Sequence, residues 1–155
     1  MRKFVVDTSS LIDLEIYYPY IVFPSLWNFL FKMFDEGKLF SVKEVYRELK
    51  DSQEVWKDYK DCFRDLSNEE YGYVSEIMSL DKFNAFRNRG MEKTKGGPWA
   101  DPYLVACGAT DKNVTVISQE SSRNHPRSVI PYVCDEYGVK CIKFLDFLRE
   151  TNFKV

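Results

Sequence analysis

The chain has 155 residues, of which 45% are hydrophobic and 16% aromatic, enough to bury a sizeable core and to exclude an intrinsically disordered protein. Its formal net charge is −2 at pH 7, so the molecule as a whole does not attract polyanions. A nucleic-acid partner would therefore have to be held by a local basic patch or through bound metal.

The cysteines do not form a zinc-binding pattern. No two of the four stand in a Cys-x-x-Cys pair, and the single histidine, His125, lies near none of them in the sequence. We expect reduced thiols, as in a cytoplasmic protein. After Met1-Arg2-Lys3 only three apolar residues precede Asp7, too few for a signal peptide, and no apolar run approaches the length of a membrane span. The sequence thus predicts a cytoplasmic protein without membrane association.

The first predicted element is a short buried strand over residues 3–6, followed by the turn into a helix. Asp7 stands at the carboxyl end of this strand, which is the edge where open parallel sheets bind ligands. Aspartate is also a favoured residue at a helix N-cap. A capping role and a ligand-binding role therefore both stay open for Asp7.

Helices are predicted next over residues 24–36, 42–50, 53–63 and 68–80. The first begins with Pro24, and the last opens with the capping-box pair Ser67 and Glu70. In the helix over 42–50, Glu48 falls at the edge of the apolar stripe and is placed to reach inward. Glu44 falls nearly opposite that stripe and is expected to face water.

Residues 81–98 are predicted to be a basic, mobile connection, because lysines and arginines outnumber acids there and Gly-Gly-Pro at 96–98 breaks regular structure. Two more arginines follow Glu120 closely in the sequence. These cations are either solvated loop charges or contacts to the phosphates of a nucleic acid. The candidates for phosphate contacts are Arg87, Arg89, Lys93, Lys95, Arg123 and Arg127.

A buried helix is predicted from Asp101, with Asp101 as its cap and Pro102 at its first position. A strand over 114–118, a helix over 129–137, a strand over 139–143 and a helix over 145–150 follow. This alternation predicts one domain over residues 1–155. Its expected fold is a three-layer α/β/α arrangement around a mainly parallel sheet of about four to five strands.

Four acids stand where they could converge on one rim of this sheet: Asp7, Glu48, Asp101 and Glu120. A phosphodiester repels carboxylates, so an acidic rim suits phosphate chemistry only if hard cations separate the two. Mg²⁺ and Mn²⁺ take oxygen ligands of this kind. A bound metal can generate hydroxide from water and stabilise the departing oxygen. The pattern therefore favours a divalent-metal site.

Four stretches resemble the acidic motifs of PIN-domain nucleases, in the same order and with similar gaps. They are residues 5–12, 45–49, 100–106 and 116–120. In the fourth, Glu120 stands where the family usually has Asp. Residues 17–27, Trp56 and residues 130–134 are similar to an uncharacterised PIN-like subfamily, so that the resemblance covers nearly the whole chain.

This resemblance implies a metal-dependent endoribonuclease that hydrolyses RNA with Mg²⁺ or Mn²⁺, often as the toxin of a toxin–antitoxin pair. It implies that Asp7, Glu48, Asp101 and Glu120 are the catalytic, metal-binding acids, with Thr8, Ser9 and Ser118 as supporting hydroxyls. Glu120 is one methylene longer than Asp and could act through water instead of binding the metal directly. The implied partners are an RNA substrate, a cognate antitoxin and a second copy in a homodimer. Aromatic residues gathered between Tyr17 and Phe31 are a further reason to expect the dimer.

Two other functions stay open. The first is a PIN-like fold that is catalytically weak and acts by binding a protein partner. The second is a phosphatase of the aspartyl-phosphate type, which also has an aspartate after its first strand. Such an enzyme requires another acid two residues later, where this chain has Ser9, so this alternative is the weakest of the three.

Overall fold

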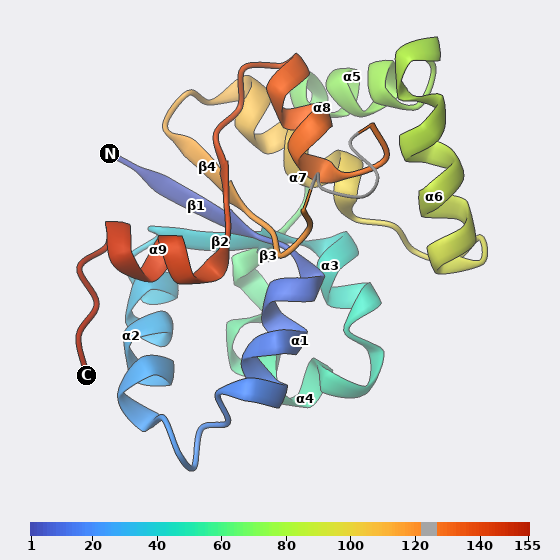
Figure 1. Ribbon diagram of the computed structural model, residues 1–155. Helices are drawn as coiled ribbons and strands as arrows, with labels where there is room; N and C mark the ends of the chain where they lie inside the picture. Colours follow the sequence, from blue (N-terminus) through green and yellow to red (C-terminus); the bar gives the residue numbers. More distant parts are fainter. Residues whose placement is uncertain (122–126) are drawn as a thin grey trace.

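The computed structural model describes residues 1–121 and 127–155 (Figure 1). In these residues a five-stranded sheet has the order β3-β2-β1-β4-β5, and all four strand pairs are parallel. The helices cover both faces of the sheet, which confirms the predicted three-layer α/β/α fold. The strands are β1 (Lys3–Val6), β2 (Leu39–Val42), β3 (Phe63–Arg64), β4 (Val114–Ile117) and β5 (Cys141–Ile142).

The α-helices of the described residues begin and end close to the predicted bounds in most cases. They are α1 (Thr8–Tyr17), α2 (Pro24–Asp35), α3 (Lys43–Glu48), α4 (Gln53–Trp56), α5 (Asn68–Ile77), α6 (Asn84–Thr94), α7 (Asp101–Thr110), α8 (Ile130–Glu136) and α9 (Phe144–Glu150). Short 3₁₀ turns cover Lys50–Ser52, Lys57–Cys62 and Asp81–Phe83. The capping box of α5 is present with both of its hydrogen bonds. None of these helices is long and apolar enough to cross a membrane.

Strand β1 lies at the centre of the sheet, between β2 and β4. Its residues Phe4, Val5 and Val6 are all buried, as expected of a central parallel strand that helices cover on both sides. Helix α7 packs beside it and is buried from Leu104 to Gly108. Gly108 lets α7 also pack closely on Val139, because a Cβ at that position would stand 2.3 Å from the Val139 side chain. The core thus fixes both β1 and α7, and with them the residues at their ends.

Two predictions of secondary structure were wrong. Residues 81–98 are not merely a connection, because α6 occupies residues 84–94. Most residues of this helix are polar or charged, but it has a narrow apolar contact in which Phe86 and Gly90 pack on Trp99. The helix predicted over 53–63 ends early, since Tyr59 has non-helical backbone angles and Phe63 pairs with β2. Strands β2 and β3 had no specific prediction.

Candidate functional site

The strand order places a topological switch point between β1 and β4. The chain moves from β1 to β2 on one side of the sheet, and from β4 to β5 on the other. Ligands of open α/β proteins bind at such a switch point, beyond the carboxyl ends of the strands. Asp7 directly follows β1, and Ser118 directly follows β4. The topology therefore selects the same edge that the acidic residues indicated.

Asp7 is buried at this edge and caps α1. Its Oδ1 accepts the Ser10 backbone N–H at 2.8 Å, and its Oδ2 accepts the Ser9 hydroxyl at 2.8 Å. Burial raises the pKa of Asp7, while hydrogen bonds, including one from Ser118, act to lower it. The capping role is thus confirmed. A carboxylate offers about four lone-pair sites, so the contacts with Ser9, Ser10 and Ser118 still leave part of it free for a ligand.

Glu48 joins three elements at the end of α3. Its Oε1 accepts the backbone N–H of Ala100 at 2.9 Å, and its Oε2 accepts the hydroxyl of Thr8. Burial raises its pKa. The predicted inward position of Glu48 is confirmed. Glu44 was expected to face water, but its side chain is only 17% exposed and pairs with Arg47.

Asp101 is the least satisfied of the four acids. It was predicted to cap α7, which is wrong: Ala100 is the N-cap and Asp101 is the first helical residue. Among the described residues its carboxylate accepts no hydrogen bond, and its ion-pair partner is the Lys93 ammonium at 3.7 Å. Burial is the largest cause that raises its pKa to about 7. Lys93 opposes the rise, and the negative charges of the other three acids add to it.

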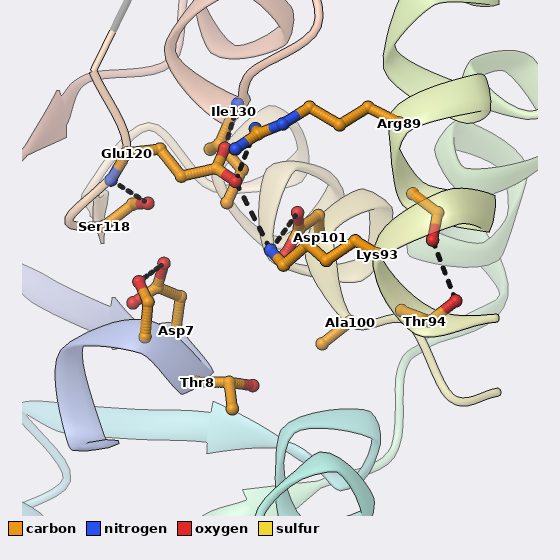
Figure 2. A network of polar contacts seen from close by, with 12 residues as sticks. Asp7, Thr8, Arg89, Lys93, Thr94, Ala100, Asp101, Ser118, Glu120 and Ile130 are labelled. Atoms are coloured by element: carbon orange, nitrogen blue, oxygen red, sulfur yellow. Dashed lines mark hydrogen bonds and ion pairs between the residues drawn. The ribbon is translucent and has the colours of Figure 1, made fainter. Parts of the chain in front are cut away.

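Glu120 is the most satisfied of the four acids, and Figure 2 shows its contacts with Arg89, Lys93 and Ile130. Its Oε1 lies 2.9 Å from Arg89 and 3.4 Å from Lys93, and its Oε2 accepts the backbone N–H of Ile130 at 2.8 Å. Its own N–H donates to the hydroxyl of buried Ser118 at 3.2 Å. Glu120 therefore ties α6 and α8 to the end of β4, and less of its carboxylate is available to a ligand.

A pocket of about 390 Å³ opens over these groups. Asp7, Glu48 and Asp101 line it together with Thr8 and Ser9, whereas Glu120 and Ser118 do not belong to its lining. Three of the four predicted acids and two of the three supporting hydroxyls thus share one pocket.

The predicted cations differ in what they contact. Lys93 and Lys95 line the pocket. Arg89 is engaged with Glu120, and Arg87 donates to the backbone carbonyls of Ile77 and Leu80 at 2.7 Å. Arg127 is exposed, while Arg123 and His125 lie outside the described residues.

A larger cavity of about 620 Å³ lies between α3 and β3 and was not predicted. Four cations line it, but acids balance them. Three of the cations form ion pairs, and the fourth, Lys60, lines the cavity beside Asp61. Because no positive charge is left over, this cavity is a weaker candidate for binding a polyanion. The ion pairs are Lys43–Asp65, Arg47–Glu44 and Arg64–Glu70.

The acid pocket can be tested for its fit to a divalent cation. In the part of the chain that the structure describes, no group of three or more His, Cys, Asp or Glu side chains could hold a metal ion as arranged. Mg²⁺ requires less than this, since it is often bound through one or two carboxylates and completes its shell with water and substrate oxygens. Asp7 and Asp101 meet that requirement: both are buried and both keep unused oxygen lone pairs.

The comparison with known families identifies the family of the chain but gives no activity. Residues 4–155 match the family described as Domain of unknown function (DUF4411). No curated protein and no solved structure matches the chain. The match spans almost the full sequence, including β1 from Phe4 onward and every acid of the pocket. The chain therefore belongs to the DUF4411 family.

Proposed function

We propose that this protein is a PIN-like, Mg²⁺- or Mn²⁺-dependent endoribonuclease that hydrolyses RNA phosphodiester bonds. The observation that carries the proposal is Asp101, whose carboxylate is buried, faces the pocket beside Asp7 and accepts no hydrogen bond from the described residues. A buried carboxylate is costly unless a cation or hydrogen-bond donors compensate it. A bound divalent cation would compensate the buried charge of Asp101.

The pocket residues have two proposed roles: some would bind the cation, and others orient the side chains around it. Asp7 and Asp101 would hold the cation, which when bound supplies activation of water and stabilisation of the departing oxygen. The Ser9 hydroxyl and the Ser10 N–H fix the carboxylate of Asp7. The Thr8 hydroxyl orients Glu48, which faces the same pocket and could accept a proton from water there.

Fewer cations remain as candidates for RNA contacts, because several of the predicted ones already contact other residues in the fold. Lys95 lines the acid pocket, whereas Arg87, Arg89 and Lys93 already contact other residues. Arg127 is exposed beside α8 and stays a candidate. In an overall acidic protein a few well-placed cations give weak, salt-sensitive RNA binding.

An exposed apolar surface supports a protein partner. At the end of α1 and in the turn after it, Ile16, Tyr17, Tyr20, Ile21 and Val22 are each at least half exposed. Trp27, from the same aromatic stretch, is instead buried in the core. We propose that this surface binds a second copy of the chain or a cognate antitoxin, as expected of a toxin in a toxin–antitoxin pair.

The same surface also favours the second candidate function, a catalytically weak protein that acts by binding its partner. A cleavage assay on mixed RNA separates the two. The purified chain should cleave RNA with Mg²⁺ or Mn²⁺ and stop when a chelator is added. If no RNA is cleaved with either metal while the chain is folded and dimeric, the binding function replaces the nuclease.

A further inference from the structure

Lys93 places its ammonium group between two of the four acids. Its Nζ lies 3.7 Å from Oδ2 of Asp101 and 3.4 Å from Oε1 of Glu120 (Figure 2). These two carboxylate side chains are only 9% and 8% exposed, while the side chain of Lys93 is 46% exposed. The lysine therefore reaches from solvent into the acidic rim, to the place where a cation bridging Asp101 and Glu120 would stand.

Helix α6 holds Lys93 at this place through contacts away from the acids. Gly90 lies so close to the indole of Trp99 that a Cβ would stand 2.3 Å from it. The ring of Phe86 packs on the same indole at 4.8 Å between centroids. Arg87 ties the helix to the end of α5 through two backbone carbonyls. Since the backbone of α6 is fixed in this way, the position of Lys93 is built into the fold.

The charges of the site leave room for one divalent cation. The four carboxylates carry four negative charges when ionised, and Arg89 and Lys93 return two positive charges through their ion pairs. The two negative charges that remain match one Mg²⁺ or Mn²⁺. Two divalent cations would leave the site with a net positive charge while both basic side chains stay in place.

The free lone pairs of the carboxylate oxygens also indicate one divalent cation. The carboxylate of Glu120 already contacts three donors. Asp7 accepts hydrogen bonds from Ser9, Ser10 and Ser118, and Glu48 accepts two. Asp101 contacts the ammonium of Lys93 at longer range. Free lone pairs thus lie on the pocket side, toward Asp7, Glu48 and Asp101. The side between Asp101 and Glu120 is already occupied by Lys93.

We propose that Lys93 takes the place of a second metal ion between Asp101 and Glu120, so that the site binds one divalent cation per chain. This inference rests on the proposed metal-dependent function and adds the number of ions to it. It also gives α6 a role: the helix delivers the permanent cation of the site.

The test is the number of Mn²⁺ ions that the full-length chain binds, measured by titration calorimetry and by the electron paramagnetic resonance of free Mn²⁺. The wild type should bind one ion. Lys93→Met keeps the length and apolar stem of the side chain and removes its charge, so it should bind two. Lys93→Arg restores the charge and should bind one. Lys95→Met is the matched control, since Lys95 lines the same pocket without an ion pair to any described acid, and it should bind one.

Two ions in the wild type would overturn the inference about Lys93 and leave the proposed metal-dependent function standing. One ion in Lys93→Met would overturn it as well. If neither the wild type nor Lys93→Met binds Mn²⁺, the metal-dependent function itself fails, and this inference fails with it. Circular dichroism of each variant confirms that the counts refer to folded protein.

Discussion

Replacing Asp101 with asparagine should make the metal-free protein more stable while removing its response to metal. In the folded protein Asp101 is buried, lies near three other acids and has a pKa of about 7, instead of the ordinary 3.8. The folded state therefore binds this proton more tightly than the unfolded state. The resulting contribution to stability is fully present below pH 3.8 and is lost as the pH rises through about 7.

The pKa difference sets the size of the effect. At 1.36 kcal/mol per pKa unit, the ionised Asp101 costs the folded protein about 4 kcal/mol at pH 8. The Asp101→Asn variant would avoid this cost. The attraction of Lys93 is already contained in the pKa of about 7, so the lost ion pair takes nothing further from the gain. A gain of about 4 kcal/mol corresponds to a melting temperature higher by roughly 8–16 °C in a chain of this size.

Thermal unfolding followed by circular dichroism in the presence of EDTA measures the gain. At pH 5 it should shrink to about 2 kcal/mol, because folded Asp101 is then mostly protonated and only the unfolded state still loses the proton. Asp58→Asn, at an exposed aspartate away from the pocket, is the control and should stay within about 0.5 kcal/mol of the wild type. Equal or lower stability of Asp101→Asn at pH 8 would refute the reasoning. Adding Mn²⁺ should raise the melting temperature of the wild type and not that of Asp101→Asn.

Three further changes test the parts around Asp101. Asp7→Asn keeps a capping side chain on α1, so urea denaturation should find it about 1 kcal/mol more stable than Asp7→Ala, and equal stabilities would contradict the cap. Gly90→Ala should destabilise the protein by about 1–3 kcal/mol, because its Cβ would meet Trp99 at 2.3 Å; a variant as stable as the wild type would show that the contact can relax. Glu120→Gln should speed hydrogen exchange in α6 by at least about fivefold, since Arg89 loses its charged partner, and unchanged exchange would argue against the clamp.

The sequence predicts best what local composition decides. β1 is a continuous apolar run that ends at Asp7, and its burial on both faces follows from that pattern. Helix α2 begins at Pro24 and is followed by Gly37 in the left-handed region, as its sequence indicates. The pocket acids could be located because each stands next to such an element.

What the sequence did not predict depends on contacts between distant residues. β3 has two residues, too few for a periodic pattern. Helix α6 is mostly charged, and its contact with Trp99 is visible only in the fold. The pair between Arg89 and Glu120 spans 31 positions of the chain. The spacing of Phe86 and Gly90, four residues apart, was the available sign of a helical face.

Cleavage of a labelled, mixed-sequence single-stranded RNA by the wild type and by Asp101→Asn is the most direct test of the central claim. Both proteins are measured at equal concentration in excess over the RNA, with Mn²⁺ and with EDTA. The wild type should cleave with Mn²⁺ and not with EDTA, and Asp101→Asn should cleave at least about a hundredfold more slowly although it is the more stable protein. Equal cleavage by the two proteins, or wild-type cleavage that persists in EDTA, would contradict a metal-dependent nuclease site built on Asp101.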